Sequence, residues 1–267
     1  MKKIDKPILS RDPWQQLKGF THARIALGRA GSSLPTKELL DFTLSHAMAR
    51  DAVHLALNVT ALARDLEREG FSTQLVQSKA PDRMSYLLRP DYGRQLDQQS
   101  RRQLQTVKLE TAFDSVNLVI VIGDGLSSLA VERHVKPLLA EIKKNIPEQW
   151  KLGPLVIATQ ARVALADEIG ELLDAAIVFM LIGERPGLRS PDSLSIYMTY
   201  APRVDCSDAD RNCISNICSE GLSYEAAAKK LIWLAKEARR RKLSGVALKD
   251  ESSVQEIAVI GQHRKLV

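Results

Sequence analysis

The loop Gly183-Glu184-Arg185-Pro186-Gly187 places a carboxylate beside a guanidinium, directly after the apolar run Ala175–Ile182. A short buried strand that ends in a loop bracketed by glycine and proline puts polar side chains at the edge of a sheet. Open α/β sheets bind their ligands at that edge. We therefore expect this loop to contribute to a ligand site.

Three other predicted strands are also followed by loops with polar or glycine residues. These loops are Gly123-Asp124-Gly125, Gln160-Ala161-Arg162-Val163, and Ala201-Pro202-Arg203 running on toward Cys213. In a parallel sheet, loops of this kind meet at one edge and can line one crevice. We therefore expect the four loops to converge.

The chain carries no motif of a self-sufficient catalyst. It has no Gly-x-Ser-x-Gly, no His-Glu-x-x-His and no Walker phosphate loop. Asp167, Glu168 and Glu171 lie on a predicted helix, near whose start carboxylates more often complement the helix dipole than act as general acids. In a dinucleotide loop, Ser128 would replace the third glycine and Asp124 would repel a pyrophosphate. We expect no catalytic residue in this chain.

Cysteine and histidine content predicts no metal site. Cys206, Cys213 and Cys218 form no Cys-x-x-Cys pair, and the five histidines are scattered. This pattern favours free thiols in a reducing compartment. No apolar run is long enough to span a bilayer, and the N-terminus has no secretory signal. We expect a cytoplasmic chain that takes neither a metal ion nor a membrane as partner.

The net charge of +6 and the isoelectric point near 9.2 permit an anionic partner. The basic run Lys236–Lys242 ends a predicted helix, where cations offset the negative end of the dipole. It lacks the interleaved aromatic residues of a single-strand binding platform. We interpret it as a solvated helix end and expect no nucleic-acid partner.

An α/β fold is predicted for the segments that position these loops. Residues 1–110 are expected to be a helical N-terminal region, with helical periodicity from Thr36 to Leu66 and a break near Asn58. Residues 111–267 are expected to be a Rossmann-like, mainly parallel open sheet. Its predicted strands are Leu118–Ile122, Leu155–Thr159, Ala176–Ile182 and Ser195–Tyr200, and its last helix runs from about Tyr224 to Lys242 with Ser223 as N-cap.

Segments from about residue 20 to residue 245 resemble, in order, the small (light) subunit of ethanolamine ammonia-lyase. They are Ala23–Gly31, Arg89–Arg94, Gly123–Ser127, Arg162–Val163 with Asp167–Glu171, Leu188–Leu194, and Asp210–Ile217. No single segment carries the resemblance. Taken together they identify the family.

The resemblance implies a ligand for the loops. In that family adenosylcobalamin lies between a large catalytic subunit, a TIM barrel, and a Rossmann-like small subunit, in assemblies of six large and six small subunits. The family's small-subunit contacts with the cofactor fall on Val163, Glu184 and Cys213. No Asp-x-His-x-x-Gly motif is present, so the resemblance implies base-on binding without a cobalt ligand from this chain. Some members carry a longer N-terminal stretch that directs them into a bacterial microcompartment, and its shortness here leaves encapsulation open.

Other interpretations of these residues stay open from the sequence alone. Glu184 paired with Arg185, Val163 in the core and Cys213 as an inert thiol are the alternatives to cofactor contacts. For the whole chain, the alternatives are a stand-alone nucleotide-binding α/β enzyme and a basic nucleic-acid-binding module. The resemblance favours the small subunit of a radical lyase that converts ethanolamine to acetaldehyde and ammonia.

Overall fold

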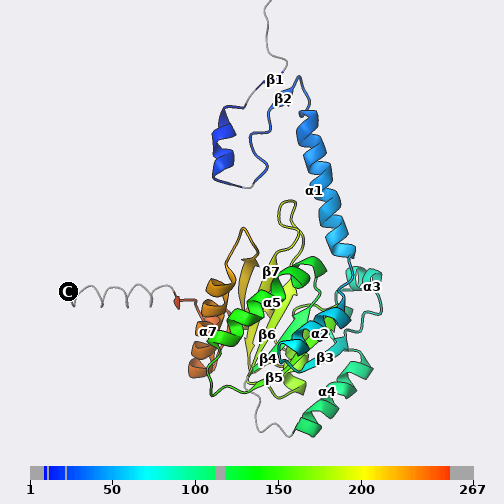
Figure 1. Ribbon diagram of the computed structural model, residues 1–267, viewed down its shortest axis with the longest axis vertical. Coiled ribbons are helices and arrows are strands. Elements are labelled where there is room, and N and C mark those ends of the chain that lie inside the picture. The colour runs from blue at the N-terminus through cyan, green and yellow to red at the C-terminus, as the bar shows by residue number, and fades with distance from the viewer. Residues whose placement is uncertain (1–8, 11, 22, 112–117, 253–267) are drawn as a thin grey trace, which may run out of the picture.

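A six-stranded mixed sheet forms the centre of the protein. The computed structural model describes residues 9–10, 12–21, 23–111 and 118–252 (Figure 1). In spatial order the strands are β3 (Thr73–Gln77), β5 (Leu152–Thr159), β4 (Leu118–Gly123), β6 (Ile177–Gly183), β7 (Leu194–Tyr200) and β8 (Arg211–Ile217). The first four are parallel, whereas β7 runs antiparallel to both β6 and β8. The predicted α/β class with a mainly parallel open sheet is confirmed.

Helices cover both faces of this sheet. α2 (Val59–Arg68), α5 (Ser128–Asn145) and α7 (Tyr224–Arg241) share one apolar cluster with residues of one face, and α6 (Leu165–Leu172) lies in the cluster of the other face. α4 (Gln98–Thr111) contributes Leu104 beside α6. Because β4 and β6 are buried on both faces, their sequences are continuous apolar runs rather than alternating ones.

Local sequence rules explain the helix boundaries. The helical pattern of the first third divides into α1 (Thr36–His54) and α2, and the Asn58 side chain caps α2 by accepting the Ala61 N–H at 3.1 Å. Ser223 caps α7 in the same way through Ala226. Both predicted boundaries are confirmed. No helix in the described residues is long and apolar enough to cross a membrane.

Short elements complete the chain. They are β1 (Leu9–Ser10) paired with β2 (Arg29–Ala30), α3 (Arg83–Leu88), and the 3₁₀ turns η1 (Pro13–Gly19), η2 (Tyr92–Arg94), η3 (Asp208–Asp210) and η4 (Gly245–Ala247). In Figure 1, α1 rises away from the sheet and its helices, and the N-terminal segment with η1 and β2 lies at its far end.

Two features of the sheet differ from the sequence analysis. Strands β3 and β8 were not predicted, because both are short, partly polar segments. β7 was treated as a strand of a parallel sheet, but it forms a hairpin with β6. Although β3 precedes residue 110, division of the chain into domains at 110/111 stays a prediction.

Candidate functional site

The loops that follow β4 and β6 touch at the carboxyl edge of the parallel strands. The Leu126 N–H donates to the Gly183 carbonyl at 2.9 Å, and Gly125 adopts a left-handed φ of +57°. A Cβ on Gly183 would lie 2.0 Å from the Ser127 carbonyl oxygen. The glycines flanking this edge therefore allow two loops to approach at backbone distance.

Asp124 joins the loop after β4 to the loop after β5. Its carboxylate accepts the backbone N–H groups of Gln160 and Ala161, each at 3.0 Å, and its side chain is buried. Arg83 of α3 donates to the Gly125 carbonyl at 2.8 Å and lies 3.5 Å from Asp124. In a phosphate loop, amides of this kind would face an anionic ligand. Here the two amides bind the Asp124 carboxylate instead.

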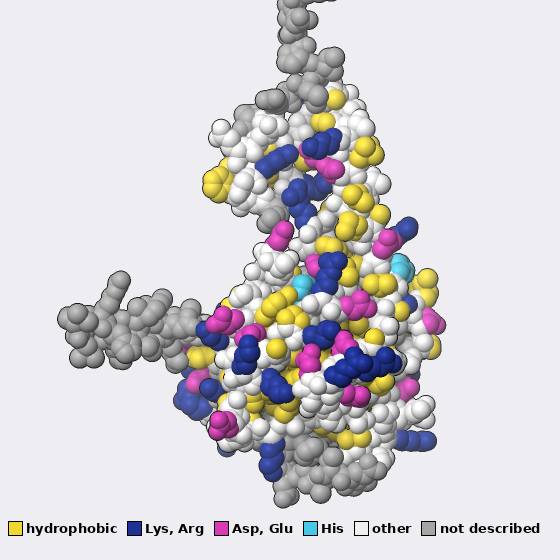
Figure 2. Space-filling model, viewed as in Figure 1, with side chains coloured by type: hydrophobic (Ala, Val, Ile, Leu, Met, Phe, Trp, Pro, Cys, Tyr) yellow, Lys and Arg dark blue, Asp and Glu magenta, His cyan; other side chains and the backbone are white. Residues whose placement is uncertain are grey.

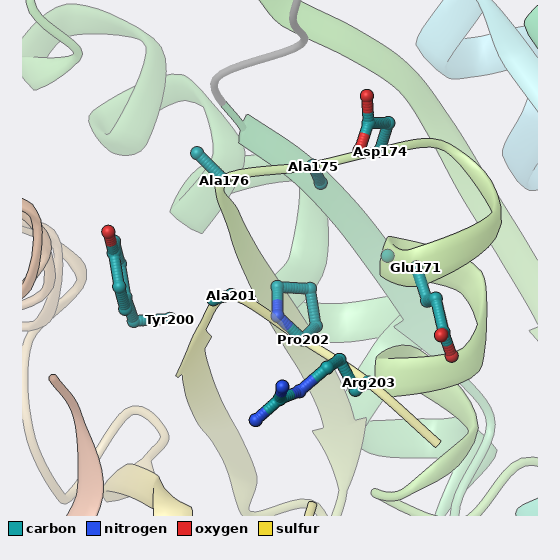
Figure 3. A pocket seen from close by; sticks show the side chains of 9 residues that line it. Glu171, Asp174, Ala175, Ala176, Tyr200, Ala201, Pro202 and Arg203 are labelled. Carbon is teal, nitrogen blue, oxygen red and sulfur yellow. The ribbon is translucent and has the colours of Figure 1, made fainter. Parts of the chain in front are cut away.

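The fourth loop does not join the other three. Because β7 is antiparallel, Ala201-Pro202-Arg203 lies at the opposite edge of the sheet, and the predicted convergence of four loops is wrong on this point. There it borders a cavity of about 500 Å³. Figure 3 shows Glu171 and Asp174 on one side of that cavity, with Tyr200 and Arg203 on strands and loops of the other. None of the predicted cofactor residues lines it.

A second cavity, of about 410 Å³, brings Val163 and Cys213 together. It lies where Val163 and Ala164 lead into α6, beside β7 and β8. Cys213 reaches it as a strand residue of β8, opposite Tyr197 in the β7–β8 pairing. The lining residues are Arg94, Arg162, Val163, Ala164, Tyr197, Asp208, Arg211 and Cys213.

Glu184 is connected to this cavity through one hydrogen bond. The Tyr197 hydroxyl donates to Glu184 Oε1 at 2.9 Å, so the carboxylate of the loop after β6 is held by a residue of the cavity wall. Glu184 is half-buried and its partner is Tyr197, not the neighbouring Arg185 that the sequence suggested as an alternative. Val163, Glu184 and Cys213 therefore form one group around Tyr197.

The cavity wall perturbs both titratable groups that face each other across β7 and β8. Burial raises the pKa of the Tyr197 hydroxyl, and the neighbouring Cys213 and Glu184 raise it further, so the phenol keeps its proton as a donor. Desolvation also raises the pKa of the Cys213 thiol; the Tyr197 hydrogen bond lowers it and the Glu184 charge raises it. Cys213 is thus a neutral, polarisable thiol at an exposed position of the wall.

Arginine side chains dominate the charge of the lining. Arg211 is buried, and its guanidinium binds Asp167 and Asp208, which neutralises it. Arg162 stacks on the Tyr86 ring with 4.3 Å from Cζ to the ring centroid, and its Nη2 donates to the Tyr86 carbonyl at 3.2 Å. Its Nε is buried and has no hydrogen-bond partner among the residues that the structure describes.

The acidic residues of α6 have hydrogen-bond or ion-pair partners elsewhere in the fold. Asp167 pairs with Arg211, Glu168 accepts the Leu96 N–H at 2.8 Å and binds Arg101, and Glu171 accepts the Val204 N–H at 3.0 Å. Within the described part of the chain, no three His, Cys, Asp or Glu side chains are grouped to hold a metal ion.

Sequence reasoning missed Tyr197 and Arg211. Tyr197 lies in the predicted strand Ser195–Tyr200, and only the strand register shows that it faces Cys213. Arg211 begins a strand that was not predicted. The sequence held one indication that β6 and β7 form a hairpin. The connection 184–193 between them is too short for a crossover helix.

Known proteins resemble this chain over nearly its full length. A family model described as ethanolamine ammonia-lyase light chain matches residues 11–249. A protein of Pseudomonas fluorescens named ethanolamine ammonia-lyase small subunit is 52% identical over 250 residues, which cover 93% of this chain and 91% of that protein. A protein of Azotobacter vinelandii with the same name is 53% identical over 251 residues, covering 94% and 93%.

Proposed function

Because the chain belongs to the ethanolamine ammonia-lyase light chain family, we propose that it forms one wall of an adenosylcobalamin site completed by a large catalytic subunit. The observation that carries this proposal is the grouping of Val163, Glu184 and Cys213 around Tyr197. Of three residues distant in sequence and expected to touch the cofactor, Val163 and Cys213 line one cavity, and Glu184 is hydrogen-bonded to Tyr197 of its wall. One predicted residue near the cavity could be there by coincidence and would support the proposal less.

The chemistry of the cavity fits a corrin rim. Corrin amide side chains need hydrogen-bond acceptors for their N–H groups and donors for their carbonyl groups. Glu184 offers a carboxylate, and Arg162, which lines the cavity, carries guanidinium N–H donors. Val163 and the Cys213 thiol offer apolar and polarisable surface. A corrin is larger than a cavity of about 410 Å³, so this chain would cover only part of the cofactor.

This chain binds and orients the cofactor, and the large subunit carries out the reaction on the substrate. The bound cofactor supplies the radical chemistry that deaminates ethanolamine to acetaldehyde and ammonia. The residues described above bind and orient: Tyr197 fixes the Glu184 carboxylate, and the Asp124 bonds fix the loop that carries Val163. We assign hydrogen abstraction and substrate binding to the large subunit, a TIM barrel, in an assembly of six large and six small subunits.

We further propose that the cofactor binds base-on. Among the described residues that line the cavity there is no histidine. His134, the buried histidine of α5, is engaged with Tyr224 and Asp192 at 2.8 and 3.2 Å. We place the holoenzyme in the cytoplasm, free or enclosed in a microcompartment.

Mixing experiments test this assignment. The purified chain, a purified large subunit and their mixture are each titrated with aquacobalamin, NAD or an oligonucleotide, and absorbance or fluorescence is recorded; adenosylcobalamin and ethanolamine are added for turnover. We expect cobalamin binding and turnover from the mixture, and no turnover from the chain alone. Turnover by the rigorously purified chain, or binding of NAD or oligonucleotide in place of cobalamin, would contradict the proposal.

A further inference from the structure

The described N-terminal part of the chain is rich in exposed large apolar side chains. We call residues 12–55 the arm; it comprises η1, β2 and α1, and residue 22 within it is not described. Figure 2 shows apolar side chains along its length. Most exposed large apolar side chains of the described residues belong to it: Trp14, Leu17, Phe20, Leu34, Leu39, Leu40, Phe42, Leu44, Met48 and Leu55.

Helix α1 carries an apolar stripe whose side chains are more than half exposed. Leu40, Leu44 and Met48 follow each other at four-residue spacing and are 62%, 62% and 52% exposed. The N-terminal segment packs on a different side, where the Arg24 guanidinium lies 5.3 Å from the Phe42 ring centroid. Positions two apart on a helix differ by about 200°, so the stripe lies across the helix from Phe42.

The arm lacks the packing that normally stabilises a helix. In the described part of the chain, Ala52, near the end of α1, is the only residue of this helix that is buried. The arm is held to the body at that end: Ser128 donates to the Leu55 carbonyl at 2.8 Å and Arg83 to the Val53 carbonyl at 2.6 Å. Most helical stability in proteins comes from packing an apolar face, and contiguous exposed apolar surface marks interaction sites.

The base of the arm is physically continuous with the proposed cofactor cavity. Arg83, which binds Val53, lies over the Tyr86 ring at 4.8 Å, and Arg162 stacks on the same ring at 4.3 Å. Arg162 in turn lines the cavity. A partner that closes the cavity at this edge of the sheet would therefore also meet the arm.

We infer that the arm docks into a groove of the large catalytic subunit, with Leu40, Leu44 and Met48 as anchors. This inference rests on the proposed function. The continuity with the cavity favours that partner over a second copy of this chain. The family match begins at residue 11 and includes the arm. We therefore expect the protein that binds the arm to be a partner common to the family. Helices that bind in grooves use anchors at this spacing.

Two variants of the full chain test the inference. Leu40→Glu with Leu44→Glu places charges in the stripe, and the matched control Leu75→Glu places one on the exposed side of edge strand β3, where Leu75 is 41% exposed. Affinity for the purified large subunit is measured by titration and by native mass spectrometry. We expect the double variant to weaken association at least about tenfold and the control to change it less than about twofold. Thermal unfolding should be alike, because neither leucine of the stripe is buried.

Other outcomes separate this inference from the proposed function. Unchanged association of the double variant would overturn the arm as docking element and leave the proposed function standing. A wild-type chain that forms a dimer abolished by the double variant, with unaltered large-subunit binding, would assign the stripe to a second copy and overturn the inference. Failure of the wild-type chain to bind the large subunit would contradict the proposed function itself.

Discussion

The Tyr197 hydroxyl lies 2.9 Å from Glu184 Oε1, and Tyr197 faces Cys213 across the β7–β8 pairing. One side chain thus connects a loop at the carboxyl edge of β6 to a thiol on β8. Because burial raises the pKa of Tyr197, the phenol remains a donor across the physiological range. Tyr197 is therefore a positioning residue for Glu184.

The pH dependence of Cys213 alkylation reports this arrangement in the free chain. The thiolate is the reactive form, the Tyr197 hydrogen bond lowers the Cys213 pKa, and the Glu184 charge raises it. Tyr197→Phe should shift the alkylation profile to higher pH, and Glu184→Gln should shift it to lower pH. Rates are measured with iodoacetamide and mass spectrometry.

Cys206 is the internal control of that experiment. Its thiol pKa is also raised, mainly by burial, but its neighbours are Asp167, Asp210 and Arg211 rather than Tyr197. Its profile should stay the same in both variants. Shifts of Cys213 in the same direction for both variants would contradict the geometry.

Glu184→Gln in the assembled complex should weaken cobalamin binding more than it slows turnover at saturating cofactor. Losing a hydrogen bond to a charged group costs about 1.5–3 kcal/mol, or roughly ten- to a hundredfold in affinity. Spectroscopic titration with aquacobalamin gives the affinity, and activity against cofactor concentration separates it from turnover. An unchanged half-saturation point with intact assembly would remove Glu184 from the site.

Much of the fold could be predicted because β4, β5 and β6 are buried on both faces and are therefore apolar and bounded by glycine or polar loops. The direction of β7 and the strands β3 and β8 could not be read in this way. Thr73–Gln77 is an edge strand with partly exposed side chains, and β8 carries polar residues beside an open cavity. Such segments lack the alternation that identifies a strand.

The candidate site, too, could be predicted only in part. Val163 and Glu184 follow recognisable strand ends, so convergence at one edge could be expected from the pattern. Cys213 and Tyr197 meet through strand register, which depends on pairing between segments and is not encoded locally. The resemblance supplied Cys213, but nothing in the sequence indicated Tyr197 as the residue that connects it to Glu184.

Gly183→Ala should destabilise the protein, whereas Gly187→Ala in the same loop should not. A Cβ at position 183 would lie 2.0 Å from the Ser127 carbonyl oxygen, while at 187 the nearest atom is 3.6 Å away. Forcing the two backbones apart should cost about 1–3 kcal/mol of unfolding free energy, against about 0.5 kcal/mol or less for the control. Urea denaturation of the full chain measures both. Equal stability of the two variants would mean that the loops after β4 and β6 do not touch as described.

Cobalamin affinity after the cavity is filled tests the central claim most directly. Cys213 is exposed on a strand facing the cavity, so Cys213→Trp places an indole there without displacing the core, and Val204→Trp places the same group on an exposed loop outside the cavity. Both variants are assembled with the large subunit, checked by size exclusion, and titrated with aquacobalamin. The account predicts that Cys213→Trp weakens binding at least about a hundredfold, about 2.7 kcal/mol, and that Val204→Trp changes it less than about twofold. Wild-type affinity in an assembled Cys213→Trp complex would contradict it.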